Sequence, residues 1–98
     1  MEVRFADEGL ARLAADERFT LGFDRAVERK YRQRIAYIAA AMDERDFYAM
    51  KSLHYEKLKG NREGQRSMRL NAQWRLILEI YPSGRRRVVV VKSIEDYH

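Results

Sequence analysis

The chain has 98 residues, of which 46% are hydrophobic and none is cysteine, and it carries a formal net charge of +5 from 20 basic and 15 acidic residues. This length predicts a single domain over residues 1–98, and the absence of cysteine excludes disulfides and thiolate metal sites. No apolar run approaches the roughly 20 residues of a membrane span and the first residues do not form a signal peptide, so we expect a soluble, cytoplasmic protein.

The first half of the chain predicts helices. An opening strand over residues 3–5 and a short helix over residues 8–15 precede a longer helix over residues 24–42. In the longer helix, apolar side chains recur at the i, i+3/i+4 spacing of a buried stripe, at Val27, Tyr31, Ile35, Ile38 and Met42. A shorter helix over residues 44–50 follows at once, so we expect the two helices to form a hairpin.

The second half predicts strands, because apolar and polar side chains alternate beyond residue 52. Strands are expected over residues 65–71, 74–81 and 86–91, with turn residues at Pro82-Ser83-Gly84 before the last strand. Together the segments predict an α+β fold, in which an N-terminal helical hairpin packs on one face of a small antiparallel sheet of about four strands.

The net charge is concentrated in one stretch. Residues 57–75 hold six basic residues and one acidic residue, a net +5, whereas the rest of the chain sums to zero. The basic members are Lys57, Lys59, Arg62, Arg66, Arg69 and Arg75. Such clustering is typical of a surface that binds nucleic-acid phosphates. Because Arg69 and Arg75 alternate with core-facing residues, we expect both on the open face of the sheet.

Two motifs in this half resemble a known family. The segment LKGNREGQRSMRLNAQWR at residues 58–75, followed by the terminal EDYH, resembles the HigB-like toxins of the RelE superfamily, the plasmid-maintenance killer type. The resemblance covers almost all of the chain, most loosely before residue 52. It implies a RelE-like fold and a toxin–antitoxin function, in which the toxin acts as a ribosome-dependent endoribonuclease that cleaves mRNA and inhibits translation.

Metal-independent RNA cleavage needs a base for the 2′-OH proton, cationic donors for the phosphate and an acid for the leaving 5′-oxygen. The resemblance implies Arg75, and next Lys59, as phosphate ligands. It also implies a role for the terminal Asp96, Tyr97 and His98. His98 titrates near neutrality, Tyr97 could orient or stack on a nucleotide, and Asp96 could hold either of them through a hydrogen bond.

The general base is left open between two residues. Family members commonly place a histidine just ahead of the Leu-Lys-Gly segment, whereas here Glu56 takes the nearest position and His54 lies two residues upstream. If residues 53–58 are extended, both side chains project from the same side of a strand, and either could reach the reacting hydroxyl. An exposed pair without a role is the alternative.

Four further cations, Lys57, Arg62, Arg66 and Arg69, are candidates to bind RNA, or are ordinary surface residues. At Arg66 the chain departs from the family, whose members commonly carry an aromatic residue there. The resemblance implies two partners, mRNA on the ribosome and a cognate helix-turn-helix antitoxin, which would be the only link to operator DNA.

No small-molecule cofactor or metal is expected, because His54 and His98 lie too far apart for a local zinc motif. Cleavage should therefore survive a chelator. Two other functions fit the same basic surface. One is a non-catalytic RNA- or ribosome-binding module, and the other is a protein-interaction domain whose ligand is an acidic antitoxin segment.

Overall fold

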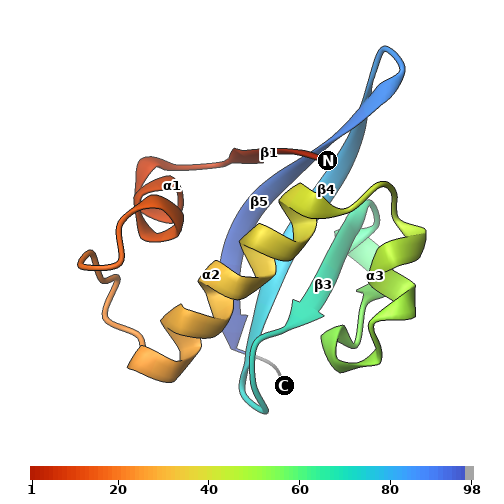
Figure 1. Ribbon diagram of the computed structural model, residues 1–98. Helices are drawn as coiled ribbons and strands as arrows, with labels where there is room; N and C mark the ends of the chain where they lie inside the picture. The colour runs from red at the N-terminus through yellow and green to blue at the C-terminus, as the bar shows by residue number, and fades with distance from the viewer. Residues whose placement is uncertain (97–98) are drawn as a thin grey trace.

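The computed structural model describes residues 1–96, so the predicted roles of Tyr97 and His98 fall outside the described residues. Five strands and three α-helices make up this part of the chain (Figure 1). The strands are β1 (Glu2–Phe5), β2 (Glu56–Lys57), β3 (Gln65–Arg69), β4 (Trp74–Ser83) and β5 (Arg86–Asp96). The helices are α1 (Glu8–Ala15), α2 (Arg25–Ala40) and α3 (Arg45–Ala49), with two short 3₁₀ turns, η1 (Lys51–Leu53) and η2 (Gly60–Arg62). None of these helices is long and apolar enough to cross a membrane.

The sheet has the order β1-β5-β4-β3-β2. Strands β3, β4 and β5 form the predicted antiparallel meander, which confirms the α+β fold class. Strand β2, which the sequence did not predict, adds to the edge of the meander beside β3. The sheet has five strands rather than four, and it is mixed, because β1 joins its edge parallel to β5. Parallel neighbours need a crossover connection, and the long segment that contains all three helices supplies it.

The helices cover one face of the sheet, with α2 crossing it in Figure 1. The predicted stripe is buried at Val27, Tyr31 and Ile38, which pack against sheet residues that include Leu76 and Leu78. Complete burial of a side chain such as Leu76 contributes about 1.5–3 kcal/mol to folding. Met42, predicted to belong to the stripe, is 87% exposed, because α2 ends at Ala40 and the chain turns away.

The hairpin of β4 and β5 is longer than predicted. Strand β5 runs to Asp96 instead of residue 91, and Pro82, expected in the turn, pairs with Arg87 inside the ladder. The turn itself is Gly84-Arg85, where Gly84 has a φ of 61°, in the left-handed region that glycine adopts without strain. Because β3 pairs with β4 only up to Glu79, the end of the hairpin extends beyond the sheet, as Figure 1 shows.

A buried arginine fixes the segment that precedes the basic stretch. Arg34 of α2 is 9% exposed, and its Nε donates to the carbonyl oxygen of Arg69 at 3.1 Å. A second nitrogen, Nη2, donates to the carbonyl oxygen of Ser52 at 3.5 Å. Burial lowers the pKa of Arg34 from its ordinary value. The side chain thus holds both η1 and the end of β3 against α2.

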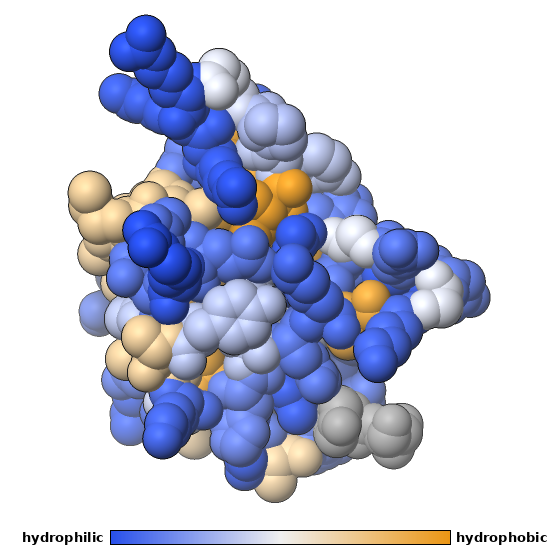
Figure 2. All heavy atoms as spheres, turned by 90° about the vertical axis from the view of Figure 1, so that its right-hand side faces the viewer, coloured by the Kyte–Doolittle hydropathy of each residue, from blue (hydrophilic) through white to orange (hydrophobic). Residues whose placement is uncertain are grey.

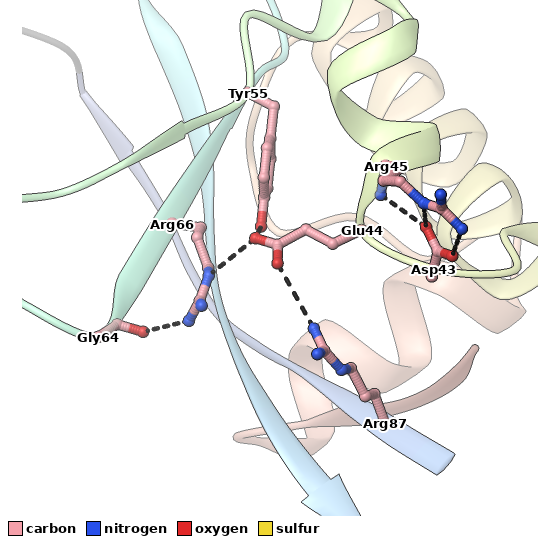
Figure 3. Close-up of polar contacts among 7 residues, drawn as sticks. All are labelled: Asp43, Glu44, Arg45, Tyr55, Gly64, Arg66 and Arg87. Atoms are coloured by element: carbon pink, nitrogen blue, oxygen red, sulfur yellow. Dashed lines mark hydrogen bonds and ion pairs between the residues drawn. The ribbon is translucent and has the colours of Figure 1, made fainter. Parts of the chain in front are cut away.

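One carboxylate ties α3 to the sheet (Figure 3). Glu44, next to the first residue of α3, accepts a hydrogen bond from the hydroxyl of Tyr55 at 2.6 Å. It also forms ion pairs with Arg66 at 3.4 Å and Arg87 at 3.6 Å. Burial alone would raise the pKa of Glu44, but the hydrogen bond and the nearby positive charges outweigh it, so the pKa lies below its ordinary value.

We expect Glu44→Gln to lower the free energy of unfolding by about 1–3 kcal/mol at pH 7, because charged hydrogen bonds are lost at a partly buried site. Since the folded-state pKa of Glu44 is depressed, its carboxylate stabilises the protein above the unfolded-state pKa, and this contribution is lost as the pH falls through the folded-state pKa. Urea denaturation from pH 7 to pH 3 should therefore show a difference between variant and wild type that shrinks in acid. Glu17→Gln, at an exposed position, is the control and should change little. A difference that does not depend on pH would contradict the role of the charge.

Candidate active site

A cleft of about 230 Å³ opens on the sheet face that the helices do not cover. Side chains from four strands and the η2 segment line it. They are Glu56, Leu58, Lys59, Arg62, Ser67, Arg75, Ile77, Glu95 and Asp96. Five of these nine residues, Glu56, Lys59, Arg62, Arg75 and Asp96, are candidates from the sequence. The fold therefore brings together residues that lie up to 40 positions apart in the chain.

Arg75 lies at the centre of this arrangement. Its side chain is only 12% exposed, and its Nη1 donates to the carbonyl oxygen of His54 at 3.3 Å. The same nitrogen lies 3.9 Å from Oε1 of Glu56, whose side chain is 49% exposed. A largely buried guanidinium therefore lies beside a carboxylate that solvent reaches, a combination that can bind a phosphate and accept a proton.

Arg62 is paired more tightly than the sequence suggests. Its guanidinium makes two hydrogen bonds to the carboxylate of Glu95, at 2.6 and 2.8 Å, and its Nε donates to Oε1 of Gln65. The hydrogen bond from Arg62 holds the pKa of Glu95 below its ordinary value. Arg62 therefore forms one wall of the cleft as half of an ion pair, while Lys59 is exposed at its rim.

Three of the predicted RNA-binding residues lie outside the cleft lining. Lys57 and Arg66 are register partners, so both point to the helix side of the sheet, where Arg66 binds Glu44. Arg69 lies on the open face as predicted, directly across from Arg75. The basic stretch is thus divided between the two faces of the sheet, because neighbouring strand residues point in opposite directions.

His54 contributes its backbone rather than its side chain. Residues 53–58 are not uniformly extended, because η1 covers residues 51–53 and His54 has φ 45° and ψ 47°, in the left-handed region. Only Glu56 and Lys57 form a strand. The shared orientation of His54 and Glu56 is therefore not observed, and of the two only Glu56 lines the cleft.

The sequence reasoning missed Glu95 and gave Ser67 no role. Glu95 follows the predicted end of the last strand, and its direction depends on a β-bulge, in which Leu78 pairs with Val91 but Ile77 pairs with Ser93. Ser67 is 2% exposed, and its Oγ has no hydrogen-bond partner among the described residues. Alternation along β3 places it on the open face, a signal that the sequence did contain.

The fold is shared with solved toxin structures. A YoeB/ParE toxin from Agrobacterium tumefaciens aligns with a TM-score of 0.62 and 18% sequence identity, over the whole of both chains. YafQ from Escherichia coli strain BL21(DE3) aligns with a TM-score of 0.60 and 10% identity, over 97% of this chain and 91% of that one. The YoeB dimer of Staphylococcus aureus gives a TM-score of 0.50 and 17% identity, over 100% of this chain and 97% of that one. No curated protein sequence matches.

These similarities define a RelE-like toxin fold, as the sequence predicted. Residues 3–98 also match the family described as the RelE-like toxin of the type II toxin–antitoxin system HigB, so the chain belongs to the HigB-like toxin family. Membership of this family implies an antitoxin partner.

The unpartnered hydroxyl of Ser67 gives a stability prediction. A buried hydroxyl without a hydrogen bond disfavours folding, so Ser67→Ala should raise the free energy of unfolding by about 1 kcal/mol. Ser93→Ala, on β5, is the matched control, since the Oγ of Ser93 donates to Glu95 at 2.7 Å. It should lower the free energy of unfolding by about 0.5–1.5 kcal/mol. Urea denaturation measures both, and a loss of stability in Ser67→Ala would show that its hydroxyl is satisfied.

Proposed function

We propose that the chain is an endoribonuclease toxin of the cytoplasm, which cleaves mRNA on the translating ribosome and thereby inhibits translation. The observation that carries the proposal is the cleft, which holds a carboxylate, Glu56, beside two cations, Lys59 and Arg75. A base next to phosphate-binding cations supplies two of the three groups that cleavage by the neighbouring 2′-OH requires, the third being an acid for the leaving 5′-oxygen. Membership of a toxin family supports the same activity.

The chemistry assigns one task to each side chain. Glu56 takes the proton of the 2′-OH, and the 2′-oxygen then attacks the neighbouring phosphorus. Arg75 and Lys59 donate charge-assisted hydrogen bonds to the non-bridging oxygens, where negative charge accumulates. The bond from phosphorus to the 5′-oxygen breaks, and the 5′-oxygen takes a proton from a general acid. The products are a 2′,3′-cyclic phosphate and a 5′-hydroxyl, and no metal ion takes part.

Tyr97 and His98, which the family resemblance implies as site residues, lie outside the described residues. We propose His98 as the general acid. Asp96 lines the cleft and accepts a hydrogen bond from Nε2 of Gln73 at 3.2 Å. Arg69 on the open face would bind flanking RNA. Lys57, which points to the helix side of the sheet, and Arg62, which is paired with Glu95, would contribute less. Arg66, with its guanidinium engaged by Glu44, would serve that purpose least.

Arg75→Ala should slow mRNA cleavage about 10²–10³-fold, because one preorganised donor to the developing charge is lost. The measurement is the rate of mRNA cleavage in a purified translation system, followed by mapping of the 3′ end for a cyclic phosphate. A truncation that removes Tyr97 and His98 should be similarly impaired. Arg18→Ala, an exposed position, is the control. Ribosome binding without any cleavage by the wild type would identify a non-catalytic module instead.

A second pair of variants separates the two candidate bases. Glu56→Gln should slow cleavage by about 10²–10⁴-fold, because the base is lost while the shape of the side chain is kept. His54→Asn removes the imidazole but keeps a residue that tolerates the left-handed backbone, and it should cleave nearly as fast as the wild type. If His54→Asn is the slower of the two, the base is His54 rather than Glu56.

We infer that the antitoxin is a helix-turn-helix protein. The toxin would then contact operator DNA only through this antitoxin. The resemblance to HigB-like toxins supports this partner. The reading frame adjacent to the toxin gene provides the test, since it should encode a small helix-turn-helix protein. A different DNA-binding class encoded there would contradict the inference without affecting the proposed activity.

A further inference from the structure

The end of the β4–β5 hairpin carries a second group of cations, distant from the cleft. Three consecutive arginines, Arg85, Arg86 and Arg87, lie at the turn and on the first residues of β5, and all three are exposed. From Arg75 to Ser83, strand β4 rises about 3.3 Å per residue, so the tip lies roughly 26 Å from Arg75 in the cleft. In Figure 2 the side chains at the top of the molecule, where Figure 1 places the hairpin end, are hydrophilic.

The charges of Arg85 and Arg86 are not neutralised within the described part of the chain, where neither side chain has an ion pair or a hydrogen bond. Arg87 differs, since it pairs with Glu44. The acidic residues that share a hollow with the tip, Glu2 and Asp43, already have partners of their own. Glu2 binds Arg4 at 2.6 Å, and Asp43 binds Arg45 at 3.1 Å.

The turn at the tip is short. Ser83 and Arg86 form the last pair of the ladder, so only Gly84 and Arg85 make the turn. A two-residue turn fixes the pairing of its two strands, so Arg85 and Arg86 lie next to each other at the end of the hairpin. Arginine can bind a phosphate through two parallel hydrogen bonds, so two arginines held in this way are suited to neighbouring phosphates.

The open face between the cleft and the tip does not continue the positive charge. Glu79 lies midway along β4, where it accepts a hydrogen bond from the hydroxyl of Tyr81 and pairs with Lys92 at 3.7 Å. Val88 and Val90 lie across from Tyr81 and Glu79 on β5. The cations on this part of the face are paired, Lys92 with Glu79 and Arg4 of β1 with Glu2. A single strand bound in the cleft would therefore meet paired charges on its way to the tip, so the tip suits a separate segment of nucleic acid.

We propose that Arg85 and Arg86 bind backbone phosphates of ribosomal RNA and thereby anchor the toxin while the cleft holds mRNA. This inference rests on the proposed function, because it takes the ribosome as the place of action. Charged residues at an exposed hairpin edge also hinder edge-to-edge association. A test variant therefore has to remove the charge and keep the polarity.

The test compares Arg85→Gln/Arg86→Gln with a control of equal charge loss, Arg25→Gln/Arg29→Gln, at exposed positions of α2. Affinity for purified ribosomes is measured by sedimentation at several salt concentrations, and mRNA cleavage is measured against ribosome concentration. The tip variant should need roughly tenfold more ribosomes for half-maximal rate, with an unchanged maximal rate. Its plot of log affinity against log salt should be shallower by about 1.5–2, as expected for the loss of two phosphate contacts. The control should stay within about twofold of the wild type.

Three results would overturn the proposal. The first is an unchanged affinity of the tip variant for ribosomes. The second is an equal loss of affinity in the control variant, which would indicate an effect of total charge. The third is a loss of antitoxin binding with ribosome binding unchanged, which would make an acidic protein segment the ligand. Sedimentation measures ribosome binding without cleavage, so the role of the tip is tested even if the wild type proves unable to cut RNA. In that case the proposed endoribonuclease activity is contradicted, while the proposed ribosome binding is judged by itself.

Discussion

The candidate active site depends on one irregularity in the pairing of β4 with β5. Leu78 pairs with Val91 and Ile77 with Ser93, so Lys92 is the extra residue of a β-bulge. In a sheet with one buried face, a shift of one residue exchanges the faces of everything that follows. Beyond the bulge, Ile94 packs against the core, while Glu95 faces the cleft across from Arg75. Without the extra residue, Glu95 would point into the core and Arg62 would lose its partner.

The cleft that results is not a simple cationic surface. Arg62 is neutralised by Glu95, and Glu56 lies close to Arg75, so cations and carboxylates alternate around a space of about 230 Å³. Uniform positive charge would favour phosphate binding alone. Alternating charge also provides groups that can accept a proton next to groups that bind phosphate, which is a requirement of acid–base catalysis.

The sequence predicted the fold and about half of the site, for identifiable reasons. Period-two alternation predicted that Arg69 and Arg75 lie on the open face, because the extra residue of the bulge lies in β5 and not in their strands. Helical spacing predicted the buried stripe of α2. The face of the sheet to which the Glu95 side chain points could not be predicted, because no residue type in the sequence indicates the bulge. The left-handed backbone of His54 could not be predicted either, because it follows from tertiary contacts of η1, including the hydrogen bond from Arg34 to Ser52. The interpretation of the basic stretch as one continuous surface was wrong in part, because strand alternation places Lys57 and Arg66 on the helix side of the sheet.

The carboxylate of Glu44 also bears on how the protein opens. A helix of five residues such as α3 has too few internal hydrogen bonds to persist by itself in water. Glu44 joins its beginning to Tyr55, to Arg66 on β3 and to Arg87 on β5, so α3 cannot detach without breaking contacts to three other segments. We therefore expect the helix to open together with these strands as one cooperative unit, so that their amide protons exchange with solvent together rather than separately.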